Sequence, residues 1–185
     1  MSAIAAFFAR WRVRLGYPLV IVVLFFARPT PRSILAGALV GAVGLWLRAF
    51  AAGYLHKQKV LTVTGPYAYT RNPLYLGSAI LTIGAGIAGR SWISAVALFV
   101  YFALFYSVVM RREERELRLR HGAVFEEYAR AVPLFIPRLT LVKVAQASVG
   151  SFTLEQYKKN HEWQAAVGYL FLLAVLLLIW YLRTR

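Results

Sequence analysis

The sequence predicts an all-α protein, a polytopic membrane helix bundle of about five transmembrane helices with a cytoplasmic amphipathic helix. Three observations predict it. Of the 185 residues, 60% are hydrophobic and 16% are charged, whereas a soluble domain carries roughly 25% charged residues. Several apolar stretches approach the length of a bilayer crossing, about 20 residues. The 22 Lys and Arg side chains flank these stretches, as expected of loops beside a membrane.

Five apolar stretches are the predicted spans. Four are long enough by themselves: Ser33–Leu55, Pro73–Gly89, Trp92–Met110 and Ala165–Leu182. The fifth, Leu15–Ala27, has 13 residues and is too short for a core of about 30 Å. It spans only if its helix begins earlier, with Arg10, Arg12 and Arg14 reaching back to the head groups.

The distribution of cations predicts the topology. With the N-terminus inside, most Lys and Arg residues lie on the cytoplasmic side, including Lys57, Lys59, Arg71 and the segment after Met110. We therefore expect an integral, multi-pass membrane protein whose chemistry faces the cytoplasm. Residues 1–185 are predicted to form a single domain, with a catalytic core at about 55–138 and a C-terminal transmembrane helix at about 163–182. The interfacial anchor at the end of that helix is formed by Trp180, Tyr181, Arg183 and Arg185.

The composition excludes several kinds of active site. All seven acidic residues are Glu, none earlier than Glu113, and Cys is absent. The composition therefore excludes mechanisms that need an Asp or a Cys residue. It also excludes disulfides and Cys-ligated zinc. His56, His121 and His161 lack metal-ligand spacing, so no metal is expected. The formal charge is +15, but the Lys and Arg residues that carry it flank apolar runs instead of covering one polar face. No nucleic-acid partner is therefore expected.

Two glycine patterns have a packing interpretation. Gly84-x-Gly86-x-x-Gly89 matches a dinucleotide-binding fingerprint, which also needs a strand before it, a helix after it and an acid about 20 residues on. Here the pattern ends a predicted span. Close helix contacts in lipid explain it better, and the same holds for Gly37 and Gly41.

A turn followed by a helix start is the first candidate site. Asn72 and Pro73 are typical of an N-cap and a first helical position, and Arg71 precedes them. Free backbone N–H groups beside an arginine suit a carboxylate. A capped helix with a positive cytoplasmic flank explains the same residues without a ligand.

Glu113 and Arg48 are the other two candidates. Glu113 lies on a helical stripe of mainly apolar residues, so it needs a cationic partner such as Arg111, Arg71 or a ligand ammonium. A solvated charge run is the alternative, in which Glu114 pairs with Arg118 at i,i+4. Arg48 lies within a predicted span, where it is either functional or reaches the interface by snorkelling.

Together these residues form a longer pattern: Leu61-x-x-x-Gly65-Pro66-Tyr67-x-x-x-Arg71-Asn72-Pro73-x-Tyr75-x-Gly77, Glu113-Glu114-x-x-Leu117, Gly122-x-x-Phe125-x-x-Tyr128 and the segment Val132–Pro137. It resembles the isoprenylcysteine carboxyl methyltransferase and phospholipid methyltransferase superfamily. The resemblance covers Lys57 to Arg138 and departs from the usual Arg-His-Pro, because Asn72 takes the place of His.

The resemblance implies an integral-membrane methyltransferase that uses S-adenosylmethionine without a Rossmann domain. The implied cofactor-binding residues are Gly65, Tyr67, Arg71, Asn72, Pro73, Tyr75, Glu113, Glu114 and Tyr128. A carboxylate for the sulfonium and ammonium groups, and an arginine for the carboxylate, match the charges of this cofactor. Asn72 cannot replace His as a proton carrier, but it still forms hydrogen bonds.

The acceptor is expected to be lipophilic and to enter from the bilayer, with membrane lipids as the other partners. A carboxylate acceptor needs no base, only desolvation and an orienting cation, for which Arg71 and Arg48 are the candidates. An amine acceptor must lose a proton, and Glu113, Glu114 and the three His residues are the available bases. The candidate catalytic residues are Arg71, Glu113 and Arg48. Carboxyl methylation of an isoprenylcysteine-like group is the first hypothesis. Phospholipid amine N-methylation, a non-catalytic scaffold of the same fold and a sterol-type reductase are the alternatives, the last disfavoured by the small number of spans.

Overall fold

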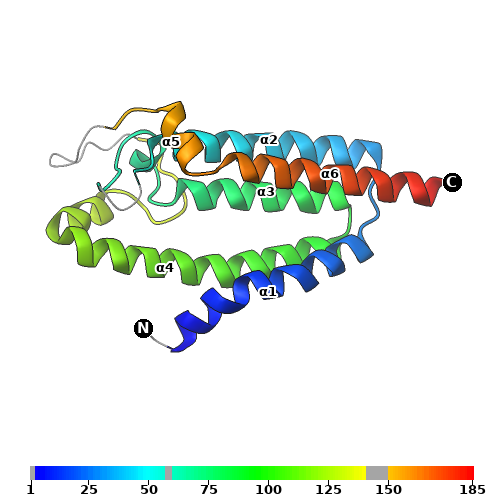
Figure 1. Cartoon of the computed structure of the whole chain (residues 1–185), viewed down its shortest axis with the longest axis horizontal. Helices are drawn as coiled ribbons and strands as arrows, with labels where there is room; N and C mark the ends of the chain where they lie inside the picture. The colour runs from blue at the N-terminus through cyan, green and yellow to red at the C-terminus, as the bar shows by residue number, and fades with distance from the viewer. Residues whose placement is uncertain (1–2, 57–59, 141–149) are drawn as a thin grey trace. The chain divides into compact units, whose positions relative to one another are not determined.

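A computed structural model describes residues 3–56, 60–140 and 150–185, with the side chains of 3–14 outside the description. All regular structure in these ranges is helical (Figure 1). The helices are α1 (Ala3–Phe26), α2 (Pro31–Tyr54), the 3₁₀ helix η1 (Gly65–Ala68), α3 (Pro73–Gly89), α4 (Trp92–Ala131), α5 (Leu154–Lys159) and α6 (Trp163–Thr184).

The predicted all-α membrane fold is confirmed, but the count of five spans is not. Among the described residues, α2, α4 and α6 are long and apolar enough to cross a membrane, while α3 and the apolar part of α1 are shorter. Between 11% and 22% of the apolar window of each long helix is buried inside the protein. Such exposed apolar helices need a lipid environment.

Helix α1 begins well before Leu15, as the sequence required. Its 24 residues correspond to about 36 Å at 1.5 Å per residue, although Pro18 lies inside it. That α1 crosses the bilayer stays a prediction. Arg10, Arg12 and Arg14, which were expected to reach the head groups, have side chains outside the description, and Lys57 and Lys59 lie outside it entirely.

Helix α4 joins two elements that the sequence separated. The predicted span ending at Met110 continues without interruption into the charged segment, so one helix carries both. The helix breaks at Gly122, which has φ 51° and ψ −124°. A Cβ at this position would meet nothing within 4 Å, so the positive φ alone favours glycine here.

The chain divides into two compact units, residues 1–43, 79–112 and 167–185 in the first and residues 44–78 and 113–166 in the second. In the first unit, small residues let helices approach closely. Tyr169 donates to the carbonyl of Gly37 at 2.8 Å. A Cβ on Gly37 would clash with Gly84 and Ala88, and one on Gly41 would clash with Tyr169. The packing interpretation of both glycine patterns is thereby confirmed.

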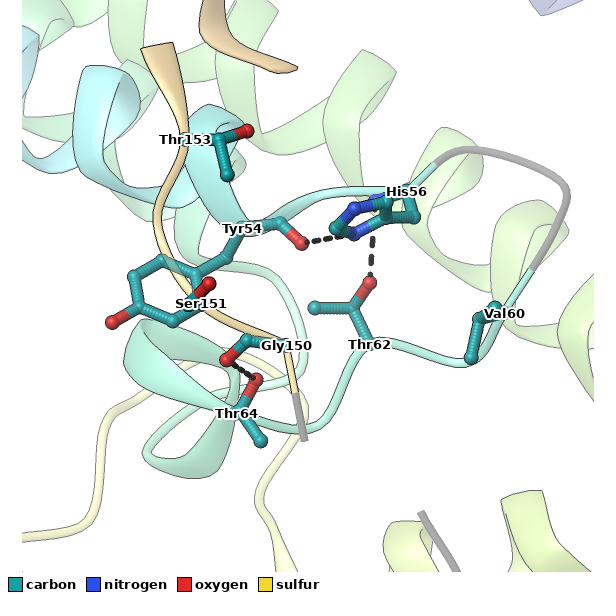
Figure 2. Close-up of a pocket in the computed structure, with 8 residues that line it drawn as sticks. All are labelled: Tyr54, His56, Val60, Thr62, Thr64, Gly150, Ser151 and Thr153. Atoms are coloured by element: carbon teal, nitrogen blue, oxygen red, sulfur yellow. Dashed lines mark hydrogen bonds between the residues drawn. The ribbon is translucent and has the colours of Figure 1, made fainter. Parts of the chain in front are cut away.

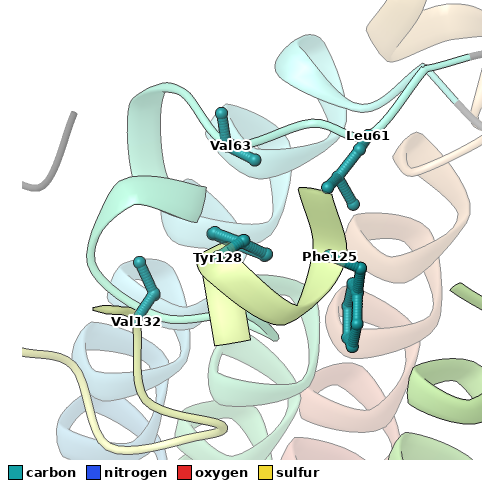
Figure 3. Close-up of a cluster of buried hydrophobic side chains, with 5 residues drawn as sticks. All are labelled: Leu61, Val63, Phe125, Tyr128 and Val132. Carbon is teal, nitrogen blue, oxygen red and sulfur yellow. The ribbon is translucent and has the colours of Figure 1, made fainter. Parts of the chain in front are cut away.

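The second unit contains the candidate site residues, and it is built around a compact apolar cluster (Figure 3). Its buried members come from the loop after α2, from α4 beyond the break and from the residue directly after α4: Leu61, Val63, Phe125, Tyr128 and Val132. Phe125 is 1% and Tyr128 2% exposed. The cluster therefore joins two chain segments about 60 residues apart and fixes the loop that carries the Gly-Pro-Tyr motif.

Candidate active site

Hydrogen bonds join the Arg-Asn-Pro loop to the segment that follows α4. The backbone N–H of Arg71 donates to the carbonyl of Pro133 at 2.9 Å, and that of Arg138 donates to the carbonyl of Tyr69 at 3.0 Å. The buried Thr70 hydroxyl donates to the carbonyl of Phe135 at 2.9 Å. These contacts bring together blocks that are distant in sequence. Sequence reasoning missed Thr70, which fills an unspecified position of the motif directly before Arg71.

Asn72 supports this junction. Its carbonyl accepts the first backbone bond of α3, from Leu76 at 3.0 Å, and α3 begins at Pro73 as the sequence predicted. Its side-chain amide donates to the carbonyl of Leu134 at 2.9 Å. The amide nitrogen therefore holds the loop in place, and a contact between Asn72 and a cofactor stays a prediction.

Arg71 forms an ion pair with Glu114. Both side chains are mostly buried, with 14% and 19% exposed. Burial lowers the pKa of Arg71 from its usual value, and the positive charge of Arg118 adds to this shift. Among the described residues, Nε of Arg71 is buried without a hydrogen-bond partner. The Nε–H group of Arg71 is thus available to donate a hydrogen bond to an additional anion.

Glu113 lies beside this pair, but on a more exposed face than the sequence predicted. Its carboxylate accepts a hydrogen bond from the Tyr75 hydroxyl at 2.5 Å. Glu113 is exposed, whereas Glu114 is half-buried. The sequence had placed Glu113 on the apolar stripe and paired Glu114 with Arg118. Arg118 instead pairs with Glu126 at 2.6 Å. Both glutamates precede the break at Gly122, and Glu114, three residues before Leu117, faces the protein in place of Glu113, four residues before it.

Tyr67 places a buried hydroxyl in the same region. The residue is 6% exposed, and its hydroxyl has no hydrogen-bond partner among the described residues. Burial raises the pKa of Tyr67 well above its usual value, and Tyr128, Glu113, Glu162 and Tyr75 add to this shift. Tyr67 is therefore a neutral donor and acceptor within the electrostatic reach of Glu113.

Gly65 and Tyr128 position Tyr67. Gly65 opens η1 with φ 59°, and a Cβ there would lie 2.8 Å from the ring of Tyr54. The Tyr128 hydroxyl donates to the carbonyl of Tyr67 at 2.7 Å, and burial raises the pKa of Tyr128. These contacts give both residues a supporting role. Their predicted contact with a cofactor is untested by this geometry.

Arg48 has contacts at both of its terminal nitrogens, while its Nε is buried without a hydrogen-bond partner among the described residues. Its Nη2 forms an ion pair with Glu162 at 2.7 Å, and its Nη1 donates to the carbonyl of Leu74 at 3.3 Å and to the hydroxyl of Ser78. Of the two sequence hypotheses, a specific role is therefore better supported than snorkelling. Sequence reasoning missed Glu162. Its only signal was an acid directly before the last span.

A separate cavity of about 270 Å³ lies near the end of α2 (Figure 2). None of the charged site residues lines it. Hydroxyl groups and one imidazole dominate its lining, and Thr64 donates to the carbonyl of Gly150 at 3.0 Å. The lining residues are Tyr54, His56, Val60, Thr62, Thr64, Gly150, Ser151 and Thr153. This cavity suits a neutral polar group.

No group of three or more His, Cys, Asp or Glu side chains that could hold a metal ion occurs among the residues that the structure describes.

Comparison with known proteins supports the class of protein. Residues 33–122 match the family of phospholipid methyltransferases. This stretch contains Arg48, the Arg-Asn-Pro loop and the Glu113-Glu114 pair. The resemblance that the motifs suggested is thereby confirmed.

Three curated relatives share sequence with the chain. It is 37% identical over 120 residues, 63% of this chain and 55% of the relative, to the nickel-cobalt-cadmium resistance protein NccN of Alcaligenes xylosoxydans xylosoxydans. It is 36% identical over 108 residues, 58% and 49%, to the cobalt-zinc-cadmium resistance protein CzcN of Cupriavidus metallidurans. It is 30% identical over 82 residues, 44% and 35%, to the protein-S-isoprenylcysteine O-methyltransferase of Schizosaccharomyces pombe.

The chain spans about half the length of the two bacterial resistance proteins and about a third of the yeast enzyme. No solved structure matches it.

Proposed function

We propose that this protein is an integral-membrane methyltransferase that transfers a methyl group from S-adenosylmethionine to a lipophilic acceptor at the cytoplasmic side of the membrane. One observation carries the proposal. The Arg71–Glu114 ion pair, the Tyr75–Glu113 hydrogen bond and the buried Tyr67 hydroxyl converge in the second unit. They unite the motif blocks that define the superfamily.

The residues present fit the cofactor by charge and by unsatisfied polar atoms. S-adenosylmethionine carries two cationic groups, a sulfonium and an ammonium, which call for acidic partners. It also carries a carboxylate, which calls for a basic partner. Glu113 and Glu114 supply the first, and Arg71 supplies the second. Nε of Arg71 and the hydroxyl of Tyr67 are buried without partners among the described residues, and unpaired buried polar groups are costly. A ligand carboxylate would satisfy Arg71.

The protein's own contribution is positioning and exclusion of water. The bound cofactor supplies an electrophilic methyl group, and transfer is an in-line displacement. Arg71 would orient the cofactor's carboxylate, and Glu113 and Glu114 its ammonium. Tyr75 holds Glu113 in place through its hydroxyl. A lipid-borne acceptor reaches such a site from between the helices, so its tail stays in the bilayer.

A carboxylate on an isoprenylcysteine-like group is the first candidate acceptor. The yeast relative, an isoprenylcysteine O-methyltransferase by name, supports it. Arg48 supports it less than expected, because Glu162 and α3 occupy both of its terminal nitrogens. A phospholipid amine is the second candidate, supported by the name of the matching family and by two carboxylates, Glu113 and Glu114, that can accept a proton.

A non-catalytic membrane protein of the same fold is the third candidate. The names of the two bacterial relatives state metal resistance and no enzymatic activity. The convergence of the ion pairs and the buried unpartnered atoms supports a ligand-binding site in either case. Methyl transfer itself therefore has to be measured directly.

The experiment combines binding with product analysis on the full chain in lipid nanodiscs. S-adenosylhomocysteine is titrated calorimetrically into the wild type, Glu113→Gln and Glu114→Gln, with Glu126→Gln as the matched control. We expect weaker binding in at least one of the first two and unchanged binding in the control. Equal affinity in all four would remove both carboxylates from the site.

Mass spectrometry of lipids and prenylated peptides after incubation with methyl-labelled cofactor then identifies the acceptor. A labelled ester indicates a carboxylate, and a labelled amine indicates a phospholipid headgroup. We expect Arg71→Ala to lose the label while the protein stays folded. Retained turnover in this variant would contradict its role, and binding without any labelled product from the wild type would favour the non-catalytic candidate.

A further inference from the structure

The segment before α6 is anchored on the end of α2 by backbone acceptors. The last carbonyls of a helix lack partners within the helix. Here the Asn160 amide donates to the carbonyls of Ala52 at 2.8 Å and Leu55 at 2.9 Å, and the N–H of Thr153 donates to the carbonyl of Gly53 at 3.1 Å. Residues far outside the family match thus cap this helix.

This cap determines where Glu162 lies. Asn160 is buried, and His161 follows it with φ 56°, a conformation that a residue with a side chain rarely adopts. The turn places the Glu162 carboxylate 2.7 Å from Nη2 of Arg48, with 10% of the Glu162 side chain exposed. The pair is thus mostly buried and held by backbone geometry on one side.

The other side of Arg48 rests on the first two turns of α3. Its Nη1 contacts the carbonyl of Leu74 and the hydroxyl of Ser78. A Cβ on Gly77 would lie 2.5 Å from Cγ of Arg48, so the glycine provides space for the arginine. Leu74, Gly77 and Ser78 share one face at helical spacing. Tyr75, which holds Glu113, directly follows the carbonyl that Arg48 binds.

We propose that Glu162 is a positioning residue of the candidate site. Its carboxylate holds Arg48 against the start of α3 and thereby sets the position of Tyr75 beside Glu113. The C-terminal segment 150–162 then belongs to the functional unit, although it lies outside the family match. Arg48 acts through α3 in this arrangement and not as an orienting cation for the acceptor. The effect on cofactor binding rests on the proposed function.

The electrostatics of Tyr67 support the same grouping. After burial and Tyr128, the charges of Glu113 and Glu162 contribute to the raised pKa of Tyr67. Glu162 therefore acts on the same buried hydroxyl as Glu113 does.

The test separates positioning from a purely structural ion pair. A 3-fluorotyrosine at position 75 reports the local environment by fluorine NMR in the full chain in nanodiscs. We compare Glu162→Gln, Arg48→Gln and the double variant with Glu155→Gln, an acid on the exposed surface of α5. Thermal unfolding is followed in parallel, and S-adenosylhomocysteine is titrated into each variant.

We expect Glu162→Gln to shift the fluorine signal and to weaken S-adenosylhomocysteine binding about tenfold, while Glu155→Gln changes neither. Arg48→Gln should have the same effects, and the double variant should show no further change, because the two residues act as one unit. Glu162→Asp, which keeps the charge, should recover part of the binding.

A folded Glu162→Gln variant with an unchanged fluorine signal would overturn the inference, even if its unfolding temperature falls, because the pair would then be structural only. Fully additive effects of the two substitutions would also overturn it. If the wild type does not bind S-adenosylhomocysteine but the fluorine signal still depends on Glu162, the proposed function fails and the positioning role stands.

Discussion

The Arg71–Glu114 ion pair gives the sharpest test of how this site is held together. In Glu114→Gln the guanidinium of Arg71 loses its counter-charge while 14% of its side chain is exposed. Removing one partner of a fully buried pair costs about 3 to 5 kcal/mol, and an exposed pair contributes about 0 to 1 kcal/mol. The neutral amide can still accept a hydrogen bond from Arg71. We therefore expect a loss of about 2 kcal/mol.

The matched control is the Arg118–Glu126 pair in the same unit. Its side chains are 54% and 39% exposed, so Glu126→Gln should cost less than about 1 kcal/mol. For a chain of this size, 1 kcal/mol corresponds to roughly 2 to 4 °C in unfolding temperature. We thus expect Glu114→Gln to unfold roughly 4 to 8 °C lower than the wild type, and Glu126→Gln to differ by less than about 4 °C.

The assay is thermal unfolding in nanodiscs at constant scan rate, extended to a double-mutant cycle with Arg71→Gln. The cycle isolates the energy of the pair from the cost of each substitution. Equal unfolding temperatures for the two Glu→Gln variants would refute the reasoning, because burial would then not determine the strength of these pairs. A coupling energy near zero would refute it independently.

Three further predictions follow from the packing of the second unit. Tyr128→Phe leaves the carbonyl of Tyr67 without its buried donor. It should lower the free energy of unfolding by about 1 to 3 kcal/mol, which thermal unfolding measures. An unchanged unfolding temperature would show that water replaces the hydroxyl. Burial raises the pKa of Tyr67 and that of Tyr128, so both side chains stay neutral in the folded protein. Above about pH 10 they ionise in the unfolded chain only. The free energy of unfolding should therefore be independent of them below about pH 10 and fall above it by about 1.4 kcal/mol per pH unit for each. Unfolding between pH 8 and 11 checks this, and Tyr128→Phe should reduce the loss. Gly77→Ala places a Cβ 2.9 Å from the carbonyl of Gly44 and should lower the free energy of unfolding by about 1 to 3 kcal/mol. The control is Gly168→Ala, whose Cβ has nothing within 4 Å and should be tolerated. Equal stability of the two variants would contradict the close approach at Gly77.

The helices were largely predictable because their signals are short-range. Hydropathy over about 20 residues located α2, α3 and α6 to within a few residues, and Asn72-Pro73 marked the start of α3. The continuity of α4 through Met110 was missed because the charged residues after Met110 resemble a new amphipathic element. A helix that leaves the apolar region can simply continue, and hydropathy alone does not show the difference.

The sequence by itself determined the class of protein, the approximate helices and the motif blocks that meet in the site, because each depends on residue type and local spacing. Only the tertiary structure decided which charges pair. Arg71 selects Glu114, 43 residues away, because the segment after α4 holds the Arg-Asn-Pro loop through bonds from Arg71 and Asn72. Arg48 selects Glu162, 114 residues away, because the carbonyls at the end of α2 are capped by the segment before α6. Pairings at such separations follow from packing, which no local pattern in the chain records.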